Sequence, residues 1–265
     1  MSSIILPEQS SHWYSQDGAP RHGATLREAR KENLLPSPTT ILGATVKSEG
    51  LETWKQEQLL ISAFSLPRNM GEDDADFAKR VVADSKVATK SAAELGTRVH
   101  DGIESILSGK SYDKGIPQLV KFEEWSRDNI DSYDWIERVQ VNLDIGVAGR
   151  ADAMIRFKGD AAKIAGTDPV LVDWKTQKMK INRRGVYCPA FYDKWIMQLA
   201  FYANCEMVPT PCVSVVINTM EAQAPLLKLW TDEERDNAWE AFNNAAELWF
   251  WIKSYRPHIE RRVLV

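Results

Sequence analysis

The strand predicted at residues 169–176 constrains the fold most strongly. It opens with the apolar run 170–172, which is typical of a strand buried inside a sheet, and then continues into Asp173, Trp174 and Lys175. Because side chains alternate along a strand, Asp173 and Lys175 lie on one face and Trp174 on the other. Charged groups at the end of a buried strand require partners there, so other polar side chains are expected to converge on this point.

Length and composition set the class of protein. The chain has 265 residues, of which 44% are hydrophobic, enough for one full core with or without a helical extension. It contains no apolar run of membrane-spanning length and no N-terminal charged segment leading into one, so we expect no membrane partner and a cytoplasmic location. The net charge of -4 argues against a protein that coats nucleic acid. An enzyme, however, can confine its basic residues to one groove.

The cysteines exclude several architectures. Cys188, Cys205 and Cys212 form an odd set without CxxC spacing, which argues against a disulfide framework, a zinc ribbon or a four-cysteine iron–sulfur cluster. We expect three small buried hydrophobic residues and no iron–sulfur cofactor.

Hydrophobic periodicity divides the chain into a helical first half and a strand-rich second half. Residues 1–36 are predicted to be a loosely structured lead-in, and residues 37–130 a helical region that includes a helix at 91–108. Residues 131–265 are predicted to hold a sheet and a C-terminal helix. The predicted class is α/β (α+β), with a central mixed sheet flanked by helices in one integrated domain.

Individual elements follow from local signals. Helices are expected at 74–107, with a break near Gly96, and at 116–129 and 191–206, and strands at 135–143, 147–157, 169–176, 212–219 and 224–230. Thr231 followed by Glu234 is a capping box that starts the C-terminal helix. On that helix an aromatic stripe is assigned to core packing in preference to base stacking; it consists of Trp239, Phe242, Ala246 and Trp249.

A second carboxylate completes a candidate site. Asp152 lies in the preceding strand, 21 positions before Asp173, a separation that allows a hairpin to place the two side by side. Adjacent buried carboxylates repel each other unless a cation lies between them, and oxygen ligands suit Mg²⁺ or Mn²⁺. Gln198 and Tyr202, four apart on a predicted helix, offer further polar groups. The alternative is an ordinary salt bridge between Asp173 and Lys175 at a strand end.

Four motifs together resemble a known family. "GTRVHDGIESIL", "GRADAMI", "LVDWKTQK" and "QLAFY" occur in the order and with the spacing of the RecB-like branch of the PD-(D/E)XK nuclease superfamily, which includes mitochondrial genome maintenance exonucleases. The lead-in "LPSPTTILGATVKSEGLETWKQEQ" looks like phage-borne members, which implies a location in a bacterium or a phage-infected cell. The resemblance covers roughly residues 36–205, and it implies a restriction-endonuclease-like core with an N-terminal helical region.

The resemblance also implies roles for individual residues. His100, Asp152, Asp173 and the backbone carbonyl of Trp174 match the metal ligands of this branch. Asp152 and Asp173 are also counted as catalytic. Lys175 matches the lysine that orients or activates the attacking water. The matches to Gln198 and Tyr202 imply that they steady this lysine and contact the DNA backbone.

One position departs from the family pattern. The family often has a glutamate in the first core strand, whereas in "WIERVQVNL" the closest match is Gln140, with Glu137 three residues earlier. Gln140 and Glu137 are the two candidates in this strand for the role of that glutamate.

Contacts to DNA are expected beside the active strand. Four basic residues follow it closely and can track phosphates, with a solvated loop as the alternative; they are Lys178, Lys180, Arg183 and Arg184. Three aromatic residues are assigned either to base stacking or to core packing: Trp13, Tyr14 and Trp54. The N-terminal helices resemble the arch of single-strand exonucleases, which implies threading of a free end.

Three hypotheses remain. The first is a Mg²⁺- or Mn²⁺-dependent DNA exonuclease that prefers single strands, acting in phage or bacterial recombination, repair or replication. The second is a processive exonuclease of the lambda recombination type, which attacks duplex ends and has a single-strand annealing or binding protein as partner. The third is an inactive module that binds DNA or protein on the same fold. An intact set of acids and lysine argues against the third, because a pure binder does not require them.

Overall fold

The computed structural model describes residues 12–47 and 49–259, and it is a mixed α/β structure. The chain divides into two compact units, residues 1–46 with 120–265, and residues 47–119. The helical region was expected to span 37–130, so the division in the structure lies further inside it at both ends.

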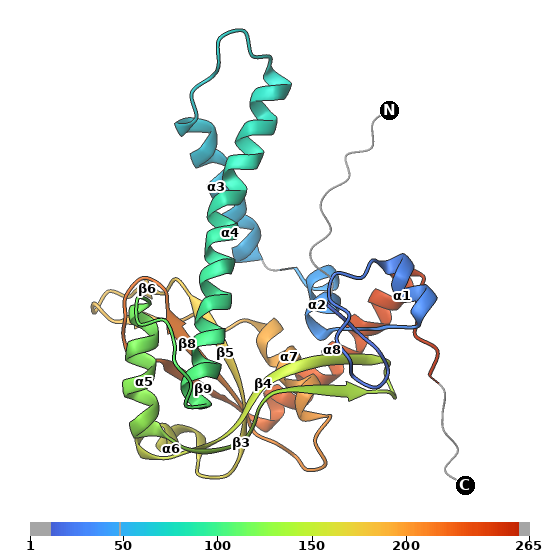
Figure 1. Cartoon of the computed structure of the whole chain (residues 1–265), viewed down its shortest axis with the longest axis vertical. Helices are drawn as coiled ribbons and strands as arrows, with labels where there is room; N and C mark the ends of the chain where they lie inside the picture. The colour runs from blue at the N-terminus through green and yellow to red at the C-terminus, as the bar shows by residue number, and fades with distance from the viewer. Residues whose placement is uncertain (1–11, 48, 260–265) are drawn as a thin grey trace. The chain divides into compact units, whose positions relative to one another are not determined.

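A five-stranded mixed sheet forms the centre of the first unit (Figure 1), in the order β3-β4-β5-β8-β9. Neighbouring strands are antiparallel except β5 and β8, which are parallel and are connected through a helix, as parallel neighbours require. The strands are β3 (Ile130–Asn142), β4 (Val147–Phe157), β5 (Val170–Gln177), β8 (Cys212–Asn218) and β9 (Leu226–Trp230). Four of them lie within two residues of their predicted positions, whereas β3 begins at Ile130, before the predicted start at 135.

Helices cover both faces of this sheet, and the alternation in β5 decides which face each helix meets. Lys175 reaches Gln198 on α7, whereas Trp174, on the opposite face, packs edge-on against Phe122 of α5 with ring centroids 5.4 Å apart. The helices of this unit are α1 (Leu26–Glu32), α2 (Pro38–Thr45), α5 (Pro117–Asn129), which begins at the end of the other unit, α6 (Gly159–Ala165), α7 (Asp193–Ala203) and α8 (Asp232–Lys253).

The C-terminal helix α8 supports α7 from behind. Its predicted capping box is confirmed, since the Thr231 hydroxyl accepts from the Glu234 backbone and the Glu234 carboxylate accepts from the Thr231 backbone. Phe242 is fully buried and its ring lies 5.3 Å from that of Phe201 on α7. The predicted stripe is therefore core, with Trp239 at its partly buried edge.

The prediction of a loosely structured lead-in was wrong for residues 12–36. This segment contains β1 (Trp13–Tyr14), α1 and β2 (Leu35–Pro36), and a second capping box joins Thr25 and Glu28 at the start of α1. Trp13 is 1% exposed, and its ring packs against Trp249 of α8. Burial of Trp13 and Tyr14 assigns both to the core rather than to base stacking; residues 1–11 of the lead-in lie outside the described part.

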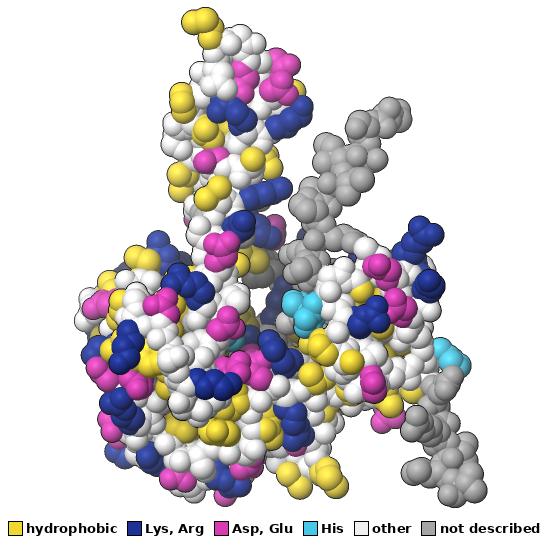
Figure 2. All heavy atoms as spheres, in the orientation of Figure 1, with side chains coloured by type: hydrophobic (Ala, Val, Ile, Leu, Met, Phe, Trp, Pro, Cys, Tyr) yellow, Lys and Arg dark blue, Asp and Glu magenta, His cyan; other side chains and the backbone are white. Residues whose placement is uncertain are grey.

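The second unit is a helical hairpin of α3 (Glu49–Ser65) and α4 (Asp74–Leu107), which lie side by side (Figure 1). The expected break near Gly96 was wrong: α4 is continuous for 34 residues, because an interior glycine costs a helix only about 1 kcal/mol. Asp73 caps it through the backbone of Asp76. On the face shown in Figure 2 the hairpin mixes hydrophobic, basic and acidic side chains.

Three further features differ from expectation or were not foreseen. The short helix α6 lies between β4 and β5, and a small hairpin of β6 (Lys180–Ile181) and β7 (Tyr187–Cys188) follows β5. Cys212 is buried as expected, but Cys205 is only partly buried and Cys188 is exposed on the small hairpin. Within the described ranges, no helix combines the length and apolar character needed to cross a membrane.

Candidate active site

Asp152 and Asp173 face each other where two strands separate. The pairing of β4 with β5 ends at Ala153 and Val172, so the two acids are the next residue on each strand. Beyond this point Asp152 Oδ2 accepts a hydrogen bond of 2.7 Å from the Trp174 backbone, in place of a ladder bond. The sequence spacing thus led to the correct juxtaposition, while the side-chain-to-backbone bond that closes the fork was not foreseen.

Lys175 lies at the centre of the polar group. Its Nζ donates to Asp173 Oδ1 at 2.8 Å and to Gln198 Oε1 at 3.2 Å. The side chain of Asp173 is 4% exposed and that of Lys175 is 19% exposed. Because both side chains are mostly buried, this pair is not the solvated strand-end salt bridge that the sequence left open. Burying an ion pair carries a desolvation cost that a surface pair avoids. Gln198 on the helix is therefore a second hydrogen-bond partner of Lys175, besides Asp173.

Tyr202 connects α7 to β4. Its hydroxyl donates to the Arg150 carbonyl at 2.9 Å, and burial, the largest cause, raises its pKa well above that of a free tyrosine, so it remains a neutral donor. The close approach of Tyr202 and Pro38 to β4 requires a glycine at position 149. A Cβ there would lie 2.8 Å from the Tyr202 hydroxyl and 2.7 Å from Pro38 Cδ. Glycine at this position allows α7 and α2 to approach the strand that carries Asp152.

Desolvation is the largest cause of the pKa shift of Asp152. It raises the pKa of Asp152, although Lys175, the Trp174 N–H and Arg150 each act in the opposite direction. Asp152 keeps some surface exposure, yet the protein encloses its carboxylate enough for this effect. The two nearby cations, Lys175 and Arg150, therefore do not fully offset the effect of burial on Asp152.

The donor set fits a hard divalent cation. The two aspartates and the Trp174 carbonyl offer oxygen atoms, the ligands that Mg²⁺ and Mn²⁺ prefer, and a cation would offset the desolvation of Asp152. Among the residues that the structure describes, no group of three or more His, Cys, Asp or Glu side chains is gathered to hold a metal. The metal ligand set remains a prediction.

The other predicted residues are distributed as follows. His100 is half-buried in α4 of the second unit, and its role as a metal ligand stays a prediction. The basic residues on and around the β6–β7 hairpin are all exposed, namely Lys178, Lys180, Arg183 and Arg184. The Asn182 side chain accepts from the backbones of Arg184 and Val186 and orders this turn. Contact with DNA here also stays a prediction.

Gln140 and Glu137, the two candidates in β3 for the family's glutamate, both bind residues outside the acid–lysine group. Gln140 is buried, and its Nε2 donates to Oε1 of Glu206 at 2.5 Å. Glu206 follows the end of α7. Glu137, at a backbone φ of 54°, forms an ion pair of 2.5 Å with Arg150 Nε. Neither bond is to the acids or the lysine, so these residues connect β3 to its neighbours.

Sequence reasoning missed two residues beside this group. Arg150 precedes Asp152 by two positions, which places it on the same face of β4, and its charge lowers the pKa of Asp152 against the effect of burial. Trp195 precedes Gln198 by one helical turn, and its ring centroid lies 6.0 Å from Lys175 Nζ. Alternation in β4 and the i, i+3 spacing in α7 were the signals available for them.

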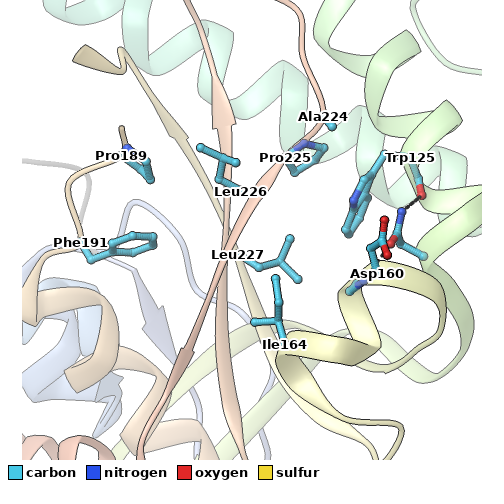
Figure 3. Close-up of a pocket in the computed structure, with 11 residues that line it drawn as sticks. Trp125, Asp160, Ile164, Pro189, Phe191, Ala224, Pro225, Leu226 and Leu227 are labelled. Atoms are coloured by element: carbon cyan, nitrogen blue, oxygen red, sulfur yellow. Dashed lines mark hydrogen bonds between the residues drawn. The ribbon is translucent and has the colours of Figure 1, made fainter. Parts of the chain in front are cut away.

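An apolar pocket lies elsewhere in the same unit (Figure 3). Its volume is about 480 Å³, and Trp125, Ile164, Phe191 and the edge-strand residues Leu226 and Leu227 contribute to its lining. None of the acid–lysine group lines it. The pocket therefore contributes nothing to the chemistry of the candidate site.

Replacing Asp152 with asparagine is expected to stabilise the metal-free protein at neutral pH. Burial raises the pKa of this carboxyl, so ionising it costs folding free energy once the pH exceeds the value in the unfolded chain, whereas an asparagine oxygen still accepts from Trp174. Thermal unfolding in EDTA should show a rise of a few degrees that disappears in acid, with Asp144→Asn in the exposed turn as the unchanged control. A lower melting temperature for Asp152→Asn at neutral pH would show that the charge stabilises the fold.

Comparison with known proteins does not assign the chain. No protein-family model matches the sequence, and a search of curated proteins finds no match.

Proposed function

We propose that this chain is a metal-dependent DNA exonuclease of the RecB-like PD-(D/E)XK type, preferring single strands. The observation that carries the proposal is the position of Lys175, hydrogen-bonded to Asp173 and Gln198 beside the fork that holds Asp152. The mixed sheet, with an antiparallel β3–β4–β5 meander followed by a parallel β5–β8 pair, is compatible with the core expected of that superfamily.

Each residue of the site has its own role in phosphodiester hydrolysis. Asp152, Asp173 and the Trp174 carbonyl would hold Mg²⁺ or Mn²⁺, which when bound supplies Lewis-acid stabilisation of the phosphate oxygens. Lys175 donates a hydrogen bond either to the attacking water or to a phosphate oxygen, and so offsets negative charge as water adds to phosphorus and the bond to the 3′ oxygen breaks. Gln198 fixes the lysine head group, which lowers the cost of orienting it.

The test compares DNA ends with closed circles. Linear single strands labelled at either end, linear duplex and circular single strands are incubated with the protein in Mg²⁺, in Mn²⁺ and in EDTA. We expect metal-dependent degradation of linear single strands with circles spared, and the label released first gives the direction. Preferential degradation of duplex ends would favour the lambda-type exonuclease, efficient cutting of circles would exclude a requirement for a free end, and no cleavage under any condition would overturn the nuclease proposal.

A further inference from the structure

Two histidines meet at the N-terminal end of the first unit. His12 Nδ1 and His22 Nδ1 are 3.1 Å apart, and the rings lie edge to face with centroids separated by 4.8 Å. The turn between them is well ordered, since Tyr14 bridges to Pro20 and the Arg21 N–H donates to the Trp13 carbonyl at 2.7 Å. The contact is thus built by the backbone, although both histidines are exposed.

Arg150 lies close enough to this pair for its charge to act on His12. Desolvation lowers the pKa of His12 most, and the charges of His22 and Arg150 lower it further. Arg150 extends from β4 and its Nε forms an ion pair with Glu137 of β3, and its side chain as a whole is 56% exposed. The Tyr14 ring lies against His22, and burial raises the pKa of its phenol, which keeps it neutral.

This arrangement favours an anion over a cation. Two facing Nδ1 atoms share one proton, so one ring donates and the other accepts. Adding one proton to each ring would place two imidazolium groups beside a guanidinium, a repulsion that a bound oxyanion offsets. A metal ion would instead add a further positive charge next to Arg150, and Glu137 already forms an ion pair with that arginine.

The group continues directly into the candidate active site along β4. Arg150 and Asp152 are two residues apart on one face of the strand, and Arg150 lies close enough for its charge to act on both His12 and Asp152. Tyr202 of α7 binds the carbonyl of the same arginine. An anion held by the histidines would therefore be the neighbour of a group bound at Asp152 and Lys175.

We propose that His12, His22 and Arg150 form a second phosphate-binding subsite, which holds a backbone phosphate of the DNA strand next to the one being cleaved. This inference rests on the proposed nuclease function. Protonation of the histidine pair strengthens the charge-assisted hydrogen bonds to the phosphate, so binding of single-stranded DNA becomes tighter as the pH falls.

Binding without cleavage isolates this subsite. The probe is a fluorescein-labelled oligothymidylate, and its affinity is measured by anisotropy in EDTA at about pH 6 and about pH 8. Wild-type protein is expected to bind roughly tenfold more tightly at the lower pH, and the double variant His12→Gln, His22→Gln should lose most of that difference. His258→Gln is the matched control, because His258 is exposed and its hydrogen bonds in the structure are made by its backbone.

The outcomes separate the inference from the proposed function. If the wild-type protein binds and degrades linear DNA but the double variant keeps the full pH dependence, the subsite is wrong and the nuclease stands. If the wild-type protein neither binds nor cleaves DNA at either pH, the proposed function fails first. Circular dichroism checks folding, and His22→Gln alone, which alters an exposed turn, gives a second variant that should lose the larger part of the pH dependence.

Discussion

Replacing Lys175 with methionine is expected to reduce metal-dependent cleavage of linear single-stranded DNA by about 10²–10⁴-fold. Methionine keeps an unbranched stem of similar length but removes the Nζ that donates to Asp173 and Gln198. The loss should appear mainly in kcat, because charge stabilisation at this position matters most as negative charge builds in the transition state.

A second variant, Lys175→Arg, separates loss of catalysis from loss of folding. Asp173 is almost completely buried, so removing its cationic partner also costs stability, and Lys175→Met alone does not separate unfolding from lost chemistry. Lys175→Arg keeps the positive charge but replaces a compact head group with a planar fork. We expect Lys175→Arg to keep a melting temperature close to wild type while losing most activity, as measured by single-turnover cleavage and thermal unfolding in parallel. Full activity in Lys175→Arg would reduce the lysine to a structural counter-ion.

Elements with strong local signals were predicted well. The position of β4 was obtained in full, and the capping box at Thr231 placed the start of α8, because alternation and capping are encoded within a few residues. The structure of residues 12–36, by contrast, depends on contacts with residues far away in the sequence. The Tyr255 hydroxyl donates to the Ala29 carbonyl at 3.0 Å and to the Leu34 carbonyl at 2.7 Å. Sequence pattern does not reveal such partners, and polar composition suggested a loose segment instead.

The candidate site shows the same division. Spacing along two strands and one helix was enough to propose that Asp152, Asp173, Lys175 and Gln198 converge. The details depend on where β4 and β5 stop pairing, which frees the Trp174 N–H for Asp152. No local pattern reports the end of a ladder between strands separated by an intervening helix, so that bond needed the structure.

Phe242 in α8 provides the opposite kind of test, a large effect on stability without one on chemistry. Its side chain is fully buried between Phe201 of α7 and its neighbour Trp239. Phe242→Ala removes a ring and leaves a cavity, which is expected to lower the free energy of unfolding by about 3–5 kcal/mol. Denaturant unfolding followed by tryptophan fluorescence measures this loss. Leu248→Ala, at a half-exposed position of the same helix, should change it by less than about 1 kcal/mol.

The activity of Phe242→Ala then decides how α7 is positioned. Phe242 packs behind the helix that carries Gln198 and Tyr202, while both of those residues are also held from the front, by Lys175 and by the Arg150 carbonyl. If these hydrogen bonds fix the helix, the variant should cleave DNA at a rate within a few-fold of wild type at temperatures where it remains folded, in contrast to Lys175→Arg, which stays folded and loses activity. A folded Phe242→Ala protein with activity reduced as far as that of Lys175→Met would instead show that core packing behind α7 sets the geometry of the site.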